Sequence, residues 1–595
     1  MPTSCSAAPR ALRAPATRRC CWLASSTCSE PVPPQCARLA GAFPLMTLPT
    51  SSRTGADILT DTLHGFGVRH VFHIPGEGIL EMVDALAARH ADIRLTSFRH
   101  EGGMAYAAQA LGQVTGQPGV CLAARAPGAL NTLLALHTAE TDAAPLLLIV
   151  GQAAAGQAGR DPLGGPDLGE VFRPVVKSVL QVGEAARVPE VLARAWQAAM
   201  SGRQGPVVVV VPENVMHENA CVADLQAPRP VRPAPPADDM ARLQGLCAGA
   251  RKPLLLLGGS GWDAAALDRM AAFAARCGWP VATAYRRGDL VDHADPHFAG
   301  ETGIGIDPVL AEGIAQADLV LAVNVRLGEI NTFGAGGFGG FRLLDAPRPR
   351  QALVHVHAEA GELNRVYQAD LAIQADPCEF AAALQALPVQ ARPDEGWLAG
   401  MRAARERFVG SGACDAPIDL RKVFEQLRER LPAQAVVTVG AGAYAVWLHR
   451  YFALRRGGRM LGPKSGAMGY GLPAAIGAAL ADAARPVVAV AGDGCFLMHA
   501  EELATAVQHG LRIVIVVVNN GGYGAIRGSQ LRLFGRAVGT DLHNPSFADY
   551  ARAFGAHAER IEETGAFLPA LERALDAAGP SLLELVLPAT VGKPQ

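Results

Sequence analysis

The sequence predicts an α/β fold made of three doubly wound parallel-sheet domains. Short runs of aliphatic and β-branched residues, bounded by Gly or Asn, recur along the chain and alternate with helix-like segments. At 595 residues the chain is too long for one hydrophobic core. Half of its residues are apolar and only 18% are charged, which indicates a large buried interior. Three successive sheets flanked by helices satisfy all of these observations.

Two breaks in the alternation divide the chain into domains. Five prolines fall within residues 227–238, which predicts an interdomain linker, and the pattern loosens again over 390–417. We therefore expect an N-terminal domain at 52–226, a central domain at 239–390 and a C-terminal domain at 418–590. Their strands are predicted at 68–74, 93–98, 120–124, 145–150, 207–211, 253–258, 281–285, 319–323, 352–356, 371–375, 435–439, 487–491, 513–518 and 582–586.

Charge and hydropathy exclude several classes of partner. Lys and Arg number 53 against 55 Asp and Glu, so there is no electrostatic basis for binding nucleic acid or an acidic membrane surface. We find no apolar run that could cross a bilayer. The 12 cysteines show no metal-binding spacing, which favours reduced thiols in a cytoplasmic enzyme. Residues 1–50 are interpreted as a disordered or untranslated extension, with an organelle transit peptide as the alternative.

The stretch 487–524 has the composition of a βαβ unit with polar residues at both strand ends. One predicted strand ends at Gly492-Asp493-Gly494, and the next ends at Asn519-Asn520-Gly521-Gly522. A right-handed crossover places both ends at one edge of a parallel sheet. Asp493 and Asn520 can therefore converge on one ligand, and their oxygen atoms suit Mg²⁺.

Glu101 is the second candidate functional residue. It follows a predicted buried strand in the Gly-rich bend Arg99-His100-Glu101-Gly102-Gly103. A carboxyl group shielded from water there can share or donate a proton to a bound heterocycle. The alternative is a surface glutamate stabilised by the positive end of a helix dipole. The metal-binding pattern downstream favours the catalytic interpretation.

Five motifs resemble the acetolactate synthase group of thiamine-diphosphate enzymes over residues 54–588. They are Val71-Phe72-His73-Ile74-Pro75-Gly76-Glu77, His100-Glu101-Gly102, Ala126-Pro127-Gly128-Ala129-Leu130-Asn131, the run Gly466-Ala467-Met468-Gly469-Tyr470-Gly471-Leu472-Pro473-Ala474-Ala475, and the unit 492–524. The resemblance implies a pyrimidine-binding, a central and a diphosphate-binding domain, in that order. It also implies a homodimer or homotetramer with active sites at the subunit interface.

The resemblance also implies roles for individual residues. Glu101 would protonate N1′ of the aminopyrimidine, the Gly466 carbonyl would accept from its 4′-amino group, and Met468 would support the bent cofactor. The residues implied for the pyrimidine pocket are Pro75, Gly76, Pro127 and Asn131. Those implied for the rest of the cofactor, partly through backbone amides, are Gly442, Ala443, Tyr444, Gly494, Cys495 and Tyr523. Those implied for Mg²⁺ are Asp493, Asn520 and the carbonyl of Gly522.

The implied reaction is decarboxylation of a 2-oxo acid followed by ligation of the acyl carbanion, with a role in branched-chain amino acid biosynthesis as one context. A related 2-oxo acid decarboxylase or carbon–carbon lyase is the alternative, and a non-catalytic cofactor-binding partner protein is a third interpretation.

Several segments depart from the family pattern and leave the substrate and acceptor unidentified. The loop 161–167 lacks the polar side chain expected there, and 523–530 lacks the usual substrate-selecting Trp. Ala443-Tyr444 replaces a Gln-His pair. In the central domain Arg326 matches flavin-binding relatives but the residues before it do not, so FAD is left open. A phosphate loop at 333–341 is a weaker hypothesis than a surface loop.

Overall fold

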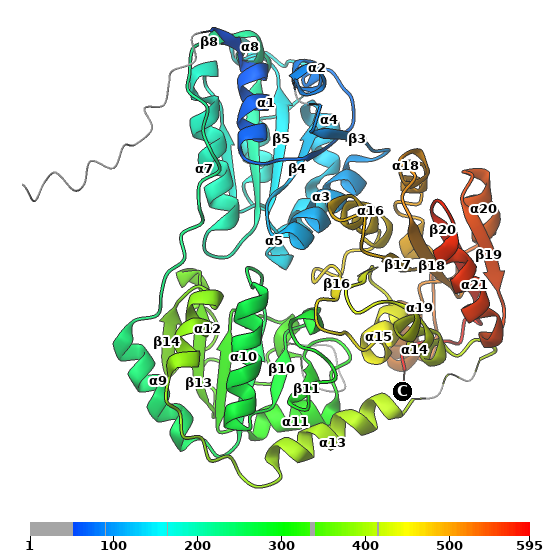
Figure 1. The fold of residues 1–595 in the computed structure, drawn as a ribbon. Helices are drawn as coiled ribbons and strands as arrows, with labels where there is room; N and C mark the ends of the chain where they lie inside the picture. The colour runs from blue at the N-terminus through cyan, green and yellow to red at the C-terminus, as the bar shows by residue number, and fades with distance from the viewer. Residues whose placement is uncertain are drawn as a thin grey trace, which may run out of the picture. The chain divides into compact units, whose positions relative to one another are not determined.

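The computed structural model describes residues 51–594 except His90, Gly164, 334–339, Ala413 and Asp415. The predicted extension 1–50 lies outside the described residues. Three six-stranded sheets follow one another along the chain, and every strand pair within them is parallel (Figure 1). This arrangement confirms the predicted fold class, whereas the domain boundaries to the residue stay a prediction.

The first sheet has the strand order β3-β2-β4-β5-β7-β6. Its strands are β2 (His70–His73), β3 (Arg94–Ser97), β4 (Gly119–Ala123), β5 (Leu146–Gln152), β6 (Ser178–Gln181) and β7 (Pro206–Pro212). The accompanying helices are α1 (Gly55–Gly65), α2 (Leu80–Arg89), α3 (Glu101–Thr115), α4 (Arg125–Asn131), α5 (Leu133–Asp142), α6 (Leu168–Phe172), α7 (Val188–Met200) and α8 (Glu213–His217). A short antiparallel pair joins β1 (Arg53–Thr54) to β8 (Asn219–Ala220).

The central sheet has the order β11-β10-β9-β12-β13-β14. Its strands are β9 (Pro253–Leu257), β10 (Val281–Thr283), β11 (Phe298–Glu301), β12 (Leu319–Val323), β13 (Ala352–His357) and β14 (Leu371–Gln374). Its helices are α9 (Ala237–Gly249), α10 (Ala264–Cys277), α11 (Pro308–Gln316), α12 (Pro377–Ala386) and α13 (Trp397–Gly410).

The third sheet has the order β16-β15-β17-β18-β20-β19. Its strands are β15 (Val436–Val439), β16 (Arg459–Leu461), β17 (Val487–Gly492), β18 (Ile513–Asn519), β19 (His557–Ile561) and β20 (Ser581–Val586). Its helices are α14 (Leu420–Arg430), α15 (Ala443–Tyr451), α16 (Gly471–Ala481), α17 (Asp493–Phe496), α18 (Glu502–Gln508), α19 (Gly524–Phe534), α20 (Phe547–Ala553) and α21 (Thr564–Asp576). Short 3₁₀ turns η1 (Ala155–Gln157), η2 (Ala185–Arg187), η3 (Gly288–Leu290), η4 (Ile330–Thr332) and η5 (Ala360–Glu362) complete the described elements.

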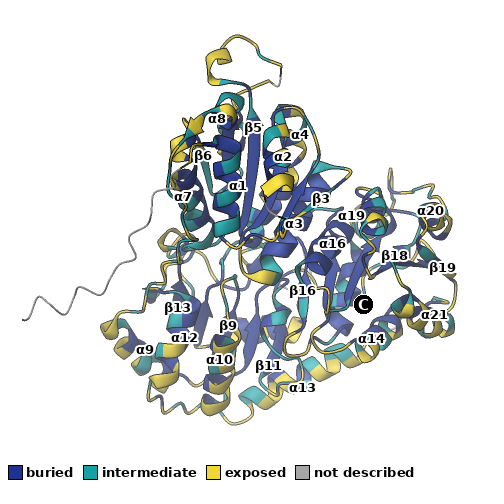
Figure 2. Cartoon of the chain, turned by 45° about the horizontal axis from the view of Figure 1, so that its top comes forward, coloured by how far each residue is buried: buried dark blue, intermediate teal, exposed yellow. Residues whose placement is uncertain are grey.

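The first and third sheets share one topology. Numbered within each sheet, both follow the order 2-1-3-4-6-5, whereas the central sheet follows 3-2-1-4-5-6, the order of dinucleotide-binding folds. Central strands such as β5 and β18 are buried on both faces, as continuous β-branched runs predict (Figure 2). Within the three six-stranded sheets, four described strands were not predicted, namely β6, β11, β16 and β19, and each lies at the edge of its sheet. The short strands β1 and β8 were not predicted either.

A shared core joins the first and third domains. Helix α3 packs along α16, and side chains of both domains belong to one cluster of buried apolar residues. At Gly477 the helices approach so closely that a Cβ would lie 2.0 Å from the carbonyl oxygen of Ala107. Small residues are therefore required along this contact. Among the described residues, no helix is both long and apolar enough to cross a membrane.

Candidate active site

The predicted pyrimidine-pocket residues gather where the strand order of the first sheet reverses. Pro75 and Gly76 directly follow β2, while Pro127 and Asn131 lie in α4, which follows the neighbouring strand β4. The two loops touch, since a Cβ on Gly76 would lie 2.7 Å from the Cβ of Ala124. Crevices at such switch points are the usual ligand sites of open parallel sheets.

Glu101 is the first residue of α3 and lies beside Asn131 at this switch point. Its carboxylate Oε2 accepts a hydrogen bond from Asn131 Nδ2 at 2.8 Å. Its other oxygen lies where a Cβ on Gly128 would come within 2.8 Å, so the glycine leaves room for the carboxylate. The structure thus brings together Glu101 and Asn131, two residues selected for different roles from the sequence. The Glu101 side chain is half-buried, and its Oε1 has no hydrogen-bond donor among the described residues.

Asp493 is the first residue of α17 and is buried at 3% exposure. Its Oδ1 accepts from the backbone N–H of Gly494 at 2.9 Å, and its Oδ2 accepts from that of Gly522 at 2.9 Å. Burial raises the pKa of the Asp493 carboxyl, and these hydrogen bonds oppose that shift. The βαβ crossover therefore brings Asp493 and Gly522 together, whereas the convergence of Asp493 and Asn520 on one ligand stays a prediction.

Two asparagines complete this edge of the third sheet. The side-chain nitrogen of Asn520 donates to the Val591 carbonyl at 3.2 Å. Asn544, which sequence reasoning missed, donates to Asp493 Oδ2 at 2.8 Å, and its own amide oxygen is buried without a described partner. Asn544 comes from the segment between α19 and α20, where no local pattern marks an asparagine as functional. Within the described residues, no group of three or more His, Cys, Asp or Glu side chains could hold a metal.

Two helix N-termini face the switch point of the third sheet. Helix α15 begins after Gly442 and α17 begins after Gly492, and neither N-cap residue supplies a side-chain cap. The Gly494 N–H of α17 already donates to Asp493 Oδ1, so the first backbone N–H groups of α15 are the ones available to an anion. The ring of Tyr444 packs on both glycines, because a Cβ at either position would lie within 2.8 Å of it. Burial raises the pKa of the Tyr444 hydroxyl well above its ordinary value. Ala443 can thus offer only backbone groups, whereas the Tyr444 hydroxyl is buried without a described partner.

The remaining predicted cofactor residues lie beside this edge. The Tyr523 ring covers Gly494, where a Cβ would lie 2.6 Å from it. Cys495 Sγ accepts from the backbone N–H of Gly469 at 3.2 Å, which holds the residue next to Met468 against α17. Met468 is half-buried and packs on the core of the third domain, and Gly466 adopts a left-handed φ of 76°.

The predicted residues therefore form two groups within one chain. The described hydrogen bonds of the Glu101 carboxylate stay in the first domain, and those of Asp493 stay in the third.

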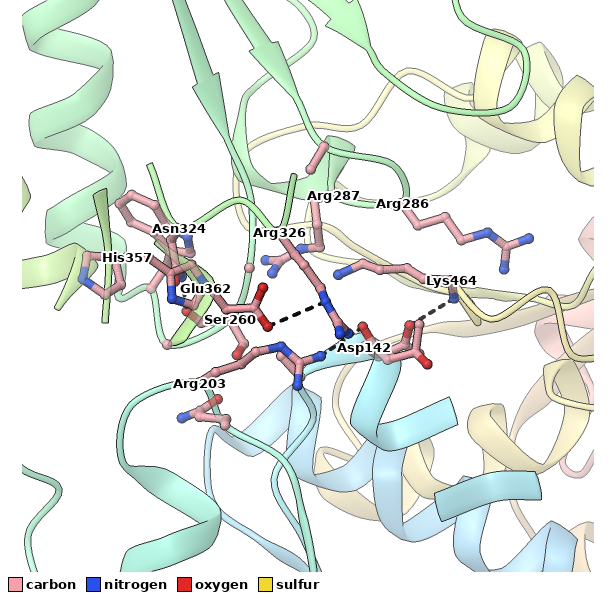
Figure 3. A pocket seen from close by; sticks show the side chains of 18 of the residues that line it. Asp142, Arg203, Ser260, Arg286, Arg287, Asn324, Arg326, His357, Glu362 and Lys464 are labelled. Atoms are coloured by element: carbon pink, nitrogen blue, oxygen red, sulfur yellow. Dashed lines mark hydrogen bonds and ion pairs between the residues drawn. The ribbon is translucent and has the colours of Figure 1, made fainter. Parts of the chain in front are cut away.

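A cavity of about 890 Å³ opens at the switch point of the central sheet (Figure 3). Loops following β9 and β12 supply Ser260, Asn324 and Arg326, while Arg203 comes from the first domain and Lys464 from the third. Arg326 forms an ion pair with Glu362 at 3.4 Å, and both side chains point into the cavity. Cationic side chains outnumber acidic ones in the lining.

Lys464 and Asp142 connect this cavity to both outer domains. The backbone N–H of Lys464 donates to Asp142 Oδ1 at 2.8 Å, while the lysine side chain extends into the cavity. Burial lowers the pKa of the Lys464 ammonium to about 8. Burial also raises the pKa of the Asp142 carboxyl. Such shifts are typical of ionisable groups at ligand sites.

Two of the segments that depart from the family pattern, 161–167 and 523–530, have exposed residues. In the loop 161–167, of which Gly164 is not described, Leu163 is 80% exposed and its carbonyl accepts from Arg125 at 2.6 Å. Helix α19, which overlaps 523–530, has no buried residue. The hypothesis of a phosphate loop at 333–341 falls largely outside the described residues.

Comparison with protein families matches three successive models to the chain. They are the N-terminal TPP binding domain of thiamine pyrophosphate enzymes at residues 53–170, the central domain of these enzymes at 240–386, and their C-terminal TPP binding domain at 440–585. The matched ranges follow the order of the three sheets.

Curated relatives resemble the chain over most of its length. The acetolactate synthase isozyme 2 large subunit of Escherichia coli is 30% identical, over 89% of this chain and 95% of its own. Acetolactate synthase 2, chloroplastic, of Zea mays is 30% identical over 97% of this chain and 91% of its own. The acetolactate synthase large subunit of Corynebacterium glutamicum is 29% identical over 88% and 84%.

Proposed function

Because this chain belongs to the thiamine pyrophosphate enzyme family, we propose that it decarboxylates a 2-oxo acid and joins the acyl unit to a second carbonyl compound. The observation that carries the proposal is the pair formed by Glu101 and Asn131 at the switch point of the first sheet. A protein that only bound the cofactor would not need a half-buried carboxylate held in this orientation. The pair thus favours an enzyme over a non-catalytic partner protein.

The residues present fit thiamine diphosphate. The uncapped N-terminus of α15 suits its diphosphate, and the half-buried Glu101 suits its aminopyrimidine. When bound, the cofactor supplies an electron sink for the carbanion left by departing CO₂. Glu101 would hold and return a proton at its carboxylate, while Asn131 fixes the orientation of that group. The Gly466 carbonyl and the Met468 side chain would orient the cofactor from the third domain.

Mg²⁺ would be held by Asp493, Asn520 and the Gly522 carbonyl. The donor set fits, because one carboxylate, one amide and a backbone carbonyl offer the oxygen ligands that this ion prefers. Asn544 has an unpartnered amide oxygen beside Asp493 and would orient the carboxylate or add a further oxygen.

The central cavity fits a phosphate-bearing dinucleotide, for which FAD is the candidate. Its volume of about 890 Å³ lies within the range of cofactor pockets, and Arg203, Arg326 and Lys464 would face phosphate groups. Flavin absorbance in protein purified under mild conditions would support FAD. Colourless protein that also fails to bind added FAD would exclude it.

The proposed assembly is a homodimer or homotetramer with active sites at the subunit interface. Large apolar side chains stay exposed on or directly after the helices near the predicted cofactor residues. They include Leu130, Leu134, Leu497, Met498, Ile526 and Phe534. A second copy of the chain would cover them. A monomer by light scattering, in the presence of cofactor and Mg²⁺, would contradict this assembly. A cytoplasmic location stays a prediction.

A substrate panel tests the proposed reaction. The protein with thiamine diphosphate and Mg²⁺ is incubated with pyruvate and other 2-oxo acids, and CO₂ and organic products are measured. Acetolactate or a homologous ligation product supports carboligation. An aldehyde as the only organic product favours the related decarboxylase, and no product with any 2-oxo acid would contradict both.

A further inference from the structure

One buried acid of the third domain lies outside the proposed cofactor site and contacts the first domain. Glu502 is the first residue of α18, and its side chain is fully buried. A carboxylate in such a place is costly unless its oxygens are hydrogen-bonded. Its partners therefore indicate what it does.

Glu502 binds the backbone directly before the predicted catalytic acid. Its Oε1 accepts from the N–H of His100 at 2.9 Å and from that of Arg99 at 3.1 Å. Its Oε2 accepts from the Thr505 hydroxyl at 2.6 Å. Residues 99–100 and Glu502 lie more than 400 positions apart in the sequence, so the contact crosses between domains of one chain.

The same carboxylate is fitted closely to the first turn of α3. A Cβ on Gly103 would lie 2.6 Å from Glu502 Oε1, so only glycine lets the helix approach this near. His100 is the N-cap of α3, and its Nδ1 accepts from the Gly102 N–H at 3.0 Å. The rings of His100 and His499 lie 5.0 Å apart, which adds a second cross-domain contact at this turn.

These contacts fix the position of the Glu101 backbone. Glu502 holds the two residues before it, and Asn131 holds its carboxylate, so the acid is constrained at the backbone and at the side chain. A catalytic group needs its reacting atoms within a fraction of an ångström of the productive position. Neither Asn131 nor the N-cap alone would prevent the turn from shifting as a unit.

We propose that Glu502 is a positioning residue that sets the place of Glu101 by accepting hydrogen bonds from the Arg99 and His100 backbone. The proposal rests on the proposed function, because it assigns Glu502 a role through Glu101. The third domain would then contribute to catalysis through two residues. Asp493 would bind the metal, and Glu502 would position the proton-transfer acid.

The test compares three variants of the full-length protein with thiamine diphosphate and Mg²⁺. We expect Glu502→Ala to slow deuterium exchange at C2 of the bound cofactor by about 100-fold, because the catalytic turn is released. Glu502→Gln should stay within about threefold of the parent protein, since its amide oxygen can still accept both N–H groups. Glu562→Ala is the control, because this exposed carboxylate of the same domain binds Arg560 and not the turn, and it should also stay within about threefold.

Cofactor affinity and the thermal midpoint are measured for each variant. If Glu502 had a purely structural role, Glu502→Ala would lower both cofactor affinity and the thermal midpoint. If Glu502 positions Glu101, the variant slows deuterium exchange while cofactor affinity stays nearly unchanged. If Glu502→Ala does not fold, Gly103→Ala takes its place, because its Cβ pushes on the same oxygen. A deuterium-exchange rate equal to that of the parent protein in folded Glu502→Ala would overturn the proposal. So would a Glu502→Gln variant that slows exchange as much as Glu502→Ala does.

Glu101→Gln separates this proposal from the proposed function. Exchange lost in Glu101→Gln but unaffected in Glu502→Ala would refute the positioning role alone. Exchange unaffected in Glu101→Gln would refute the assignment of Glu101 itself.

Discussion

The first and third sheets have the same strand order but present different chemistry at the same edge. After its second strand the first sheet presents Arg99-His100-Glu101, whereas the third presents Lys464-Ser465-Gly466. After its third strand the first sheet leads to Asn131, whereas the third leads to Asp493. The proposed function assigns a proton-transfer acid to one edge and a metal and phosphate site to the other. A shared topology supplies the place, and the side chains decide the chemistry.

The largest expected effect comes from removing the acid of the first sheet. Glu101→Gln should lower kcat by about 10³-fold, because the amide cannot transfer the proton. Cofactor affinity, measured by fluorescence quenching, should change little. Glu190→Gln, which alters an exposed acid of the same domain, serves as the control. An unchanged kcat would break the comparison, because the first sheet would then hold no catalytic acid.

Removing the acid of the third sheet should act on metal binding instead. Asp493→Ala should raise the Mg²⁺ concentration needed for half-maximal activity at least about 100-fold, since a charged ligand is lost. Titration of activity with Mg²⁺ measures this, with the exposed Asp576→Ala as control. Loss of kcat at saturating Mg²⁺ with an unchanged midpoint would assign Asp493 to the chemical step.

The contact between the two domains can be tested through stability. Gly477→Ala places a Cβ against the Ala107 carbonyl and should cost about 1–3 kcal/mol in the free energy of unfolding. Gly528→Ala, at a helical glycine with open space around it, should be neutral or slightly stabilising. Equal urea midpoints for the two variants would show that α3 and α16 are not tightly packed.

The smallest effect concerns Lys464 and pH. Its ammonium has a folded-state pKa of about 8, below the ordinary 10.5. The unfolded chain therefore binds more protons between these values, so the contribution of this group to stability rises with pH across that window. We expect Lys464→Met to be more stable than the parent at pH 7 by less than about 1 kcal/mol, because part of the lysine stays in water. The difference should shrink by pH 9 in urea titrations, and a pH-independent difference would contradict the shift.

Local patterns predicted the buried strands because those strands are continuous apolar runs. Strand β12 begins and ends at the predicted residues. The edge strands β6, β16 and β19 were missed, because each has a less buried, mixed sequence that resembles a loop. The polar residues at the ends of predicted strands, such as Glu101 and Asp493, were found because strand ends are visible in the sequence.

The sequence by itself determined the fold class, the cofactor family and the residues that end the inner strands, because each of these depends on patterns within short segments. Only the tertiary structure decided which distant residues meet. Three features depend on contacts between residues that lie tens to hundreds of positions apart in the sequence. They are the contact of Asn544 with Asp493, that of Glu502 with the turn before Glu101, and the cationic cavity at the central sheet. Such convergence depends on strand order, and no local periodicity records strand order.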